Sequence, residues 1–169
     1  MTMIIDGTNG LTFNNATTQA SAGQVLQVVN GTTNTSVTNT TVTYADTNLT
    51  ATITPKFSTS KILILIAQNM YLYDTTSVSD AGCALQIQRN SSTIYAPAPN
   101  RDFLSFYSPA GTTRFDFGTM IPLNYLDSPA STSALTYKTQ VALATAGAGA
   151  IVISNSSGYS TITLMEIAA

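Results

Sequence analysis

Apolar residues are most concentrated in the segment Lys61–Tyr73, which reads KILILIAQNMYLY. The segment has no Gly or Pro and opens with alternating Ile and Leu, which predicts a β-strand. Successive side chains of a strand point to opposite faces, and here both faces are apolar in the first half. The second face therefore needs a cover, either another part of this chain or another copy of it. From Gln68 onward the pattern is mixed, and we expect the strand to leave the buried centre there. One face carries Ile62, Ile64, Ile66, Met70 and Leu72, and the other carries Leu63, Leu65, Ala67, Tyr71 and Tyr73.

Further short apolar or alternating segments occur at regular spacing, separated by turn-forming Asp, Asn, Gly, Pro and Ser residues. No segment shows sustained helical periodicity, so strands joined by short turns predict an all-β sandwich or barrel. The predicted strands are Thr41–Tyr44, Leu49–Thr54, Lys61–Tyr73, Cys83–Asn90, Thr93–Tyr95, Phe103–Tyr107, Thr113–Leu126, Ala134–Ala144, Ala150–Ser154 and Ser160–Ile167.

Two of these strands carry more specific expectations. Ala134–Ala144 places Leu, Tyr and Val side chains on one face and Thr, Lys and Gln on the other, which is typical of a half-buried strand. Ser160–Ile167 should lie between two neighbouring strands and not at an edge. Its Glu166 shares a face with Ile162 and Leu164. That acid either pairs with an Arg or Lys across an interface or lies at the rim of the strand's end, and we expect the rim.

The beginning of the chain differs in pattern from the remainder. Met3–Ile5 and Leu11–Phe13 flank the turn sequence Asp-Gly-Thr-Asn-Gly, which predicts a small hairpin. A second short strand, Gln24–Val29, ends at an Asn-Gly pair, and the polar stretch Asn34–Thr41 connects it to the first strand of the domain. Two short strand pieces cannot bury enough area to fold alone. We therefore expect this arm to lie on a partner; the alternatives are a floppy terminus and packing against its own domain.

Composition narrows the class of protein. The 169 residues are 44% hydrophobic but only 8% charged, whereas a typical soluble domain is about 25% charged. Ser, Thr and Asn supply roughly a third of the chain and take over the surface polarity. Such a surface suits a protein held in a rigid assembly, because it relies less on charge repulsion for solubility. The net charge of −2 and the six Lys and Arg residues argue against binding to nucleic acid. No apolar run reaches the roughly 18 residues of a membrane span, so we expect no membrane insertion.

Catalytic chemistry is not visible. The chain has no His, which removes the commonest general base and the commonest metal ligand. Cys83 lies within a strand pattern, where a buried inert thiol is the expectation. Most of the acids lie at turns, where Asp is common in any case. Two carboxylates could still converge in space as in a glycosidase, but no feature favours that. The sequence therefore predicts a non-enzyme without a metal or cofactor.

Several segments of the sequence resemble structural proteins of tailed bacteriophages. The opening IIDGTNGLTFNNATTQ is similar to the first segment of such proteins. The body resembles the jelly-roll domains of phage fibre and capsid-decoration proteins, related in shape to tumour-necrosis-factor-like trimers. The phrases that carry this second likeness are TITPKFSTSKILILIAQNMYL, ALQIQRNSSTIY, IPLNYLDSPASTSALTYKTQVAL and STITLMEIA.

This resemblance implies an antiparallel jelly-roll β-sandwich over residues 37–169, preceded by an extended particle-docking arm over residues 1–36. It implies a homotrimer on the virion surface whose arm contacts the major capsid protein or another virion protein. The function implied is a capsid decoration, cement or head-fibre protein. The alternative is a tail-fibre or receptor-binding protein that recognises a host surface polysaccharide.

Each of these contacts has candidate residues. We expect the oligomer interface at Leu63, Leu65, Tyr71 and Tyr73, because aromatic residues are enriched in interface cores. We expect particle docking through the apolar residues of the arm, namely Ile4, Ile5, Leu11, Phe13, Val25 and Leu26. Under the alternative function, two loops would contact the host glycan through Asp74, Asp80, Asn100 and Arg101.

Overall fold

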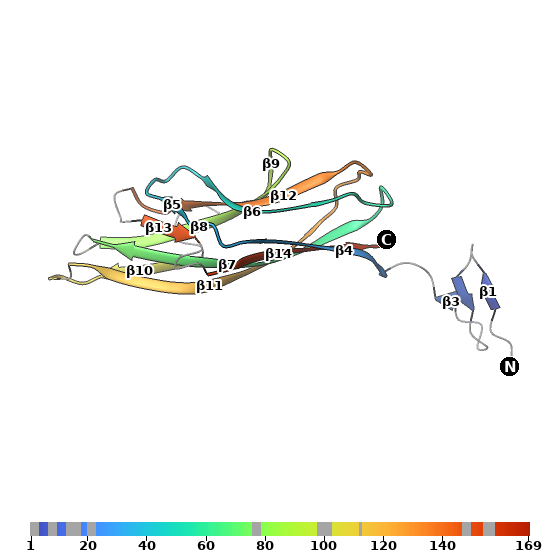
Figure 1. The fold of residues 1–169 in the computed structure, drawn as a ribbon, viewed down its shortest axis with the longest axis horizontal. Helices are drawn as coiled ribbons and strands as arrows, with labels where there is room; N and C mark the ends of the chain where they lie inside the picture. The colour runs from blue at the N-terminus through green and yellow to red at the C-terminus, as the bar shows by residue number, and fades with distance from the viewer. Residues whose placement is uncertain are drawn as a thin grey trace.

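The structure is a computed structural model of the 169-residue chain. It describes residues 23–75, 79–97, 103–111, 113–146, 150–153 and 158–169, together with the backbone of three short strands before residue 23. Throughout these residues the regular structure is β-strand, and the paired strands are antiparallel. The prediction of an all-β sandwich is confirmed. Figure 1 shows its two sheets lying one above the other along the length of the molecule.

The strands agree with the predicted ones to within a few residues over most of the domain, and the last strand agrees at both ends. Their bounds are β1 Ile4–Asp6, β2 Gly10–Thr12, β3 Thr18–Gln19, β4 Val25–Thr33, β5 Val37–Asn39, β6 Ala45–Ile53, β7 Lys61–Asp74, β8 Ser79–Arg89, β9 Ser92–Tyr95, β10 Leu104–Ser108, β11 Phe115–Asp127, β12 Leu135–Leu143, β13 Ala150–Ile153 and β14 Ser160–Ile167.

The six-stranded sheet is built around β7. Its 14 residues pair with β11 along one side. Along the other side they pair first with β14 and then with β13. Outside these lie β4, paired with β14, and β5, paired with β13. The sheet is therefore four strands wide at both ends of β7. As expected, β14 is held between two neighbours.

The five-stranded sheet lies over the first one and is centred on β8 and β12, which pair with each other. The strand β6 pairs with the far side of β12. The strands β9 and β10 pair with opposite ends of β8. In β12, Leu135, Tyr137 and Val141 are buried on the inner face, while Lys138 on the outer face is half-buried, so the predicted half-buried strand is confirmed.

The core between the sheets consists of two apolar clusters joined through β7. The first takes Ile62, Ile64 and Ile66 from this strand, and the second takes Met70 and Leu72. Between them lies Gln68, whose side chain is fully buried. The prediction that β7 leaves the buried centre at Gln68 is wrong. The inner face stays buried as far as Asp74.

Gln68 can be buried because both polar atoms of its amide group have hydrogen-bond partners. Its Nε2 donates to Ser160 Oγ at 2.8 Å, and its Oε1 accepts from Thr139 Oγ1 at 2.9 Å. The Thr139 hydroxyl in turn bonds to that of Thr47 on β6. A buried polar chain of this kind crosses the core from one sheet to the other, and a satisfied network is what makes burial of an amide tolerable.

The strand β4 changes the expected limits of the domain. The segment predicted as a short arm strand ending at Asn30-Gly31 continues to Thr33 and forms the edge of the six-stranded sheet. It also closes one side of the sandwich, because its backbone lies close to that of β6. A Cβ on Gly31 would lie only 2.1 Å from the Thr50 carbonyl oxygen of β6. Only glycine permits that approach. Val25 and Leu26, assigned to the arm from sequence, thus lie in a strand of the sandwich.

Two further expectations near the start of the domain need correction. The stretch Asn34–Thr41 is not only a connector, since Val37–Asn39 forms the edge strand β5. No strand occupies Thr41–Tyr44; the first long strand of the five-stranded sheet begins at Ala45. The expected N-terminal hairpin is present, with Ile5 of β1 opposite Leu11 of β2, and β3 extends it to a small sheet, seen at the right of Figure 1.

Glu166 fits neither expectation for it. The side chain is fully buried on the inner face of β14 and is not at a rim. Its Oε1 accepts from the backbone N–H of Lys56 at 2.7 Å, and its Oε2 accepts from the Gln27 amide at 2.6 Å. The carboxylate therefore fixes the β6–β7 connection and β4 by hydrogen bonds from neutral groups.

Candidate functional site

The outer face of the six-stranded sheet is the surface with the most distinctive composition. Antiparallel partners lie on the same face of a sheet, so the register shows which outward side chains are neighbours. One row crosses all four strands, because Val28 pairs with Met165, Met165 with Leu63, and Leu63 with Leu126. We call this row the apolar row. Two of its members are about half exposed, Val28 at 55% and Leu126 at 49%.

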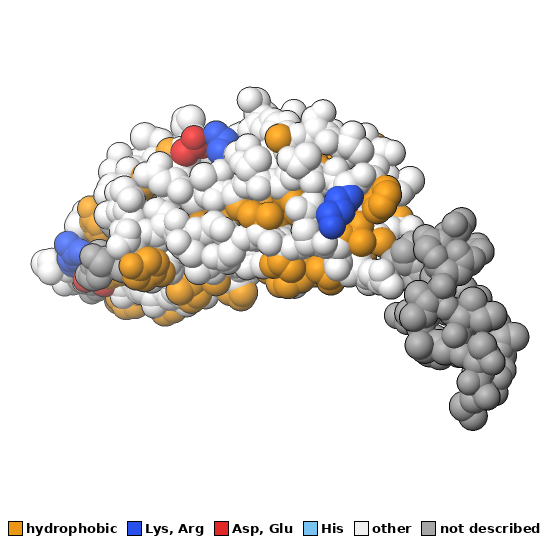
Figure 2. Space-filling view, turned by 45° about the vertical axis from the view of Figure 1, so that its right-hand side comes forward, with side chains coloured by type: hydrophobic (Ala, Val, Ile, Leu, Met, Phe, Trp, Pro, Cys, Tyr) orange, Lys and Arg blue, Asp and Glu red, His pale blue; other side chains and the backbone are white. Residues whose placement is uncertain are grey.

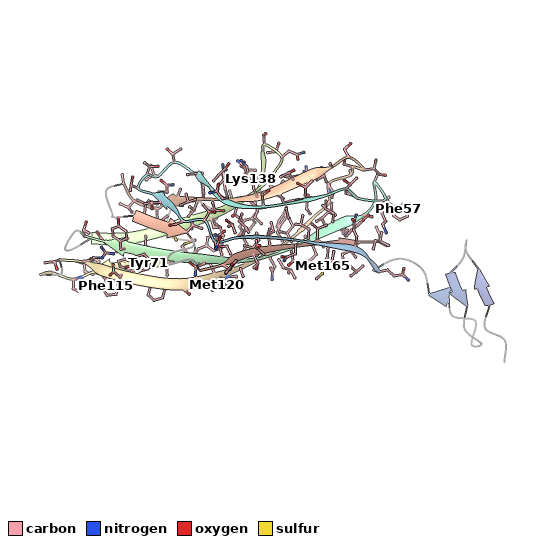
Figure 3. All side chains as sticks on the ribbon, in the orientation of Figure 1. Phe57, Tyr71, Phe115, Met120, Lys138 and Met165 are labelled. Atoms are coloured by element: carbon pink, nitrogen blue, oxygen red, sulfur yellow. The ribbon has the colours of Figure 1, made fainter. Side chains whose placement is uncertain are left out.

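Apolar side chains continue along β7 and β11 beyond the apolar row. Leu65, Ala67 and Pro122 lie next on the outer face, and Met120 is 47% exposed. We call the apolar row and these four residues together the apolar face. In Figure 3, Met120 and Met165 lie along the lower side of the sandwich, and Figure 2 shows hydrophobic side chains gathered on that side.

The outer face of the five-stranded sheet has the opposite character. Its side chains form a hydrogen-bonded polar layer, in which Gln86 Nε2 donates to Gln140 Oε1 at 2.6 Å and Gln140 Nε2 donates to Asp46 Oδ1 at 2.5 Å. Lys138 Nζ also donates to the Asp46 carboxylate at 2.9 Å. Figure 3 shows Lys138 on the upper side, away from Met120 and Met165. One outer face is thus a polar layer, whereas the other combines the apolar row with a next row that includes polar Asn30, Thr163 and Asn124.

The far end of the β7 outer face is aromatic and carries charge. Tyr71 and Tyr73 lie with ring centroids 6.1 Å apart, and the guanidinium carbon of Arg114 lies 4.4 Å from the centre of the Tyr73 ring. Arg114 Nε donates to Asp116 Oδ1 at 2.6 Å, and Arg114 Nη2 donates to the Tyr71 hydroxyl at 3.0 Å. The hydrogen bond to Asp116 is the main cause that raises the pKa of Arg114. These four residues form what we call the aromatic end.

Two shallow hollows lie between β7 and β11 on this face. One has a volume of about 400 Å³ and is lined by Leu65, Pro122 and Asn124 among others. The other has a volume of about 320 Å³ and is lined by Asn69, Met70, Tyr71, Gly118, Thr119 and Met120. The second hollow exists because Gly118, which pairs with Tyr71, has no side chain to cover the ring.

The four residues predicted for the oligomer interface share this outer face. Leu63 and Leu65 lie on the apolar face, and Tyr71 and Tyr73 lie at the aromatic end. The sequence did not indicate Val28, Met120, Leu126 or Met165, which join them through strand pairing. The period-2 alternation of residues 115–126 was a usable signal for Met120 and Leu126, whereas Val28 and Met165 are recognisable only once the register is known.

Two of the four predicted host-contact residues lie in the described part of the chain. Asp74 is fully buried at the end of β7, so it does not present its carboxylate on a loop. Asp80 lies in β8 opposite Tyr107 of β10. Asn100 and Arg101 lie outside the described residues, as does Phe13 of the arm. Of the other docking candidates, Ile4 and Ile5 lie in β1 and Leu11 in β2.

The described residues offer little catalytic chemistry. Cys83 is fully buried, its Sγ lies 3.1 Å from Met70 Sδ, and burial raises the pKa of its thiol to about 12. The prediction of a buried thiol is confirmed. Within the described part of the chain, His, Cys, Asp and Glu form no group of three or more that could hold a metal ion. Over the same residues, no helix is long and apolar enough to cross a membrane.

Comparison with known proteins does not supply a family. No protein-family model matches the chain, and no curated protein matches it. Among solved structures, dimeric latent PorU from Porphyromonas gingivalis is similar over 89% of this chain and 14% of its own, with 9% identity and a TM-score of 0.37. A likeness of that size says nothing about function.

Proposed function

We propose that this chain is a structural protein of a tailed-bacteriophage virion, of the capsid-decoration or head-fibre type, that assembles as a homotrimer. The observation that carries the proposal is the contrast between the two outer faces. The five-stranded sheet presents hydrogen-bonded Gln, Asp and Lys side chains, while the six-stranded sheet presents the apolar row. An extended exposed apolar surface in a folded protein marks an interaction site.

The size of this face is adequate for a stable contact. Four strands spaced at about 4.8 Å span about 19 Å, and the 14 residues of β7 extend over about 46 Å. The whole outer face therefore has an area of roughly 870 Å², which is an upper limit for the contact and is close to the roughly 800 Å² per partner of a standard protein–protein interface. A second copy suits it, because a face with so few charges does not repel itself, and most soluble oligomers are symmetric assemblies of one chain.

The strand edges favour contact through the face over strand addition. β11 pairs with β7 alone among the described strands, but it carries Pro122 at its middle. Proline within an edge strand removes one donor from the free edge and discourages pairing with another chain. At the opposite edge, β4 is drawn against β6 at Gly31.

The arm supplies the second part of the proposed function. In this scheme the jelly-roll, tumour-necrosis-factor-like sandwich projects outward, and the small sheet β1–β3 docks onto the major capsid protein or another virion protein. The root of the arm is held firmly, because Gly23 N–H donates to the Ala168 carbonyl at 2.7 Å and Ala168 N–H donates to the Gln24 carbonyl at 2.8 Å. Because these hydrogen bonds fix the start of the sandwich, an arm that is docked on a particle would also set the orientation of the sandwich.

The test of assembly uses Leu126→Asp with Tyr107→Asp as its matched control. Both side chains are about half exposed, at 49% and 55%, but Tyr107 lies on the outer face of the five-stranded sheet. We expect the unmodified chain and Tyr107→Asp to sediment as trimers, and Leu126→Asp to sediment as a folded monomer with an unchanged circular dichroism spectrum. An unmodified chain that is monomeric, or a Leu126→Asp variant that remains trimeric, contradicts the proposed interface.

The virion location has its own test. Quantitative mass spectrometry of purified particles should find the chain in many copies per particle if it decorates the shell. A handful of copies would favour the tail-fibre alternative. Absence from purified particles would contradict a virion role of either kind, whatever the oligomeric state.

A further inference from the structure

The hollow between Tyr71 and Gly118 has features that the apolar face lacks. Its volume of about 320 Å³ is at the lower end of the roughly 300–1,000 Å³ of small-molecule sites. It is large enough for one small ring and too small for an extended ligand. We propose that this hollow is a binding site for a single neutral pyranose unit, such as one residue of a glycan.

The Tyr71 ring provides the platform for such a ligand. Glycine is uncommon inside a strand, and it often marks a place where a ligand approaches the backbone closely. Gly118 is in register with Tyr71, and a Cβ there would lie 3.5 Å from Tyr71 Cδ2. The missing side chain therefore leaves the half-buried ring open near Cδ2. The C–H face of a pyranose is apolar and flat, so it can stack on an aromatic ring as other apolar groups do.

The polar groups around the platform match the hydroxyls at the edge of a pyranose. Arg114 donates to the Tyr71 hydroxyl and to Asp116, so a donor and an acceptor lie side by side next to the platform, although neither lines the hollow itself. Asn69 and Thr119 line the hollow, and the Asn69 Oδ1 atom is buried. In addition, no described strand pairs with β11 on its side away from β7. The backbone N–H and C=O groups on that side of Gly118 and Thr119 therefore face outward. An apolar floor with a rim of donors and acceptors fits a sugar better than a lipid chain.

The hollow lies about 20 Å along β7 from the apolar row, because the row crosses β7 at Leu63 and the hollow lies at Asn69 and Tyr71, six to eight residues further along the strand. Met120 lines the hollow and also belongs to the apolar face, so a trimer contact that used the whole face would cover the site. The sugar proposal therefore requires a trimer contact centred on the apolar row, and a monomeric Leu126→Asp chain tests sugar binding separately from assembly.

The experiment is saturation-transfer NMR on the full chain with methyl glycosides of glucose, galactose, mannose and N-acetylglucosamine. We expect millimolar binding of at least one sugar, with the strongest transfer to the ring protons on one face. Gly118→Val should abolish the transfer by filling the hollow, while Tyr71→Phe should retain most of it because the ring remains. Tyr107→Ala removes an exposed tyrosine from the other sheet and should have no effect.

Each outcome decides the proposal. Transfer that is lost in Gly118→Val, with the variant still trimeric and folded, supports the site. Absence of transfer from all four sugars to the unmodified chain overturns it, and so does transfer that is equal in Gly118→Val. If Gly118→Val instead dissociates the trimer, the hollow is covered by a second copy and the sugar site is wrong. Leu126→Asp should bind sugar normally even as a monomer.

Discussion

Glu166 shows how far a single residue can depart from what its sequence neighbourhood suggests. An acid between two apolar neighbours near a strand end predicts a rim position or an ion pair. The structure instead buries the carboxylate completely and surrounds it with the Gln27 amide and the backbone N–H groups of Lys56 and Phe57. The Lys56 and Gln27 donors lie 110 and 139 residues away in sequence. No local pattern could have indicated them.

The acid stability of the protein should depend on this carboxylate. Burial by itself raises the pKa of Glu166, but the hydrogen-bonding groups of Ser60, of Gln27 and of the backbone in the β6–β7 connection outweigh it, and the pKa is lowered below its usual 4.5. A lowered pKa in the folded state means that the ionised form stabilises the fold above about pH 4.5. This stabilisation is lost as the pH falls through the lower, folded value.

Urea denaturation of the unmodified chain and Glu166→Gln across pH 7 to 3 measures this contribution. At pH 7 we expect Glu166→Gln to be less stable by about 1–3 kcal/mol, because it loses charge-assisted hydrogen bonds. The difference should shrink below pH 4.5, since the unmodified chain loses the same charge there. Gln27→Ala, which removes one donor, should show a weaker dependence on pH. A difference that stays constant over the whole range would show that Glu166 does not titrate with folding.

At the scale of the element, β7 was predictable where the pattern was local and unpredictable where it was not. The alternation of Ile62, Ile64 and Ile66 with Leu63 and Leu65 sufficed to assign the two faces, and the structure confirms both. The mixed pattern from Gln68 onward predicts that the strand leaves the buried centre there, but the Gln68 amide is buried with its own hydrogen-bond partners. Its partners lie 92 and 71 residues further along the chain.

The apolar row was hidden for the same reason. Each of its members, taken alone, is an ordinary strand residue, and single exposed apolar side chains need no explanation. The row exists only because Val28, Leu63, Leu126 and Met165 fall in register on four strands. Register comes from the assembled sheet, so the sequence could predict that β7 needs a cover but could not outline the surface to be covered.

The buried polar chain predicts a large effect of a substitution that looks mild. Gln68→Leu keeps the size of the side chain but removes two buried hydrogen bonds, while the Thr139 hydroxyl keeps its bond to Thr47 and Ser160 Oγ still accepts from the Asn69 backbone N–H. We expect a loss of about 1–3 kcal/mol in the free energy of unfolding, because each such hydrogen bond contributes about 0.5–1.5 kcal/mol. Gln88→Leu is the control, because Gln88 is only half-buried and its bond to Thr93 is long, at 3.5 Å. We expect a change below about 0.5 kcal/mol there.

The measured free energies of unfolding can also contradict a stabilising role of the buried polar chain. Equal stability of Gln68→Leu and the unmodified protein in urea would mean that the two apolar clusters merge across β7 without the polar chain. The double variant Gln68→Leu with Thr139→Val then separates the two explanations. If buried hydroxyls with fewer partners cause the loss, removal of one of them should recover part of it.

At the scale of the whole molecule, the boundary between arm and sandwich lies earlier in the chain than the sequence predicts. From sequence, everything before residue 37 belongs to a docking arm, yet β4 is an integral edge of the six-stranded sheet and closes the sandwich against β6. Its Val-Val-Asn-Gly pattern is too short and too polar in its second half to predict such a place. The apolar row also draws one of its four members, Val28, from this strand.

Two truncations separate the arm from the sandwich. Removal of residues 1–22 leaves β4 intact together with the bonds of Gly23 and Gln24 to Ala168, so the remaining chain should fold and form the trimer with unchanged stability. Removal of residues 1–31 also deletes most of β4, exposes β14 as a new edge and removes Val28 and the Gln27 donor to Glu166. We expect that chain to aggregate or to unfold at markedly lower urea. If the arm docks the protein, the shorter truncation should fail to bind particles in a co-sedimentation assay although its trimer is intact. Binding that equals the full chain would place the docking surface on the sandwich instead.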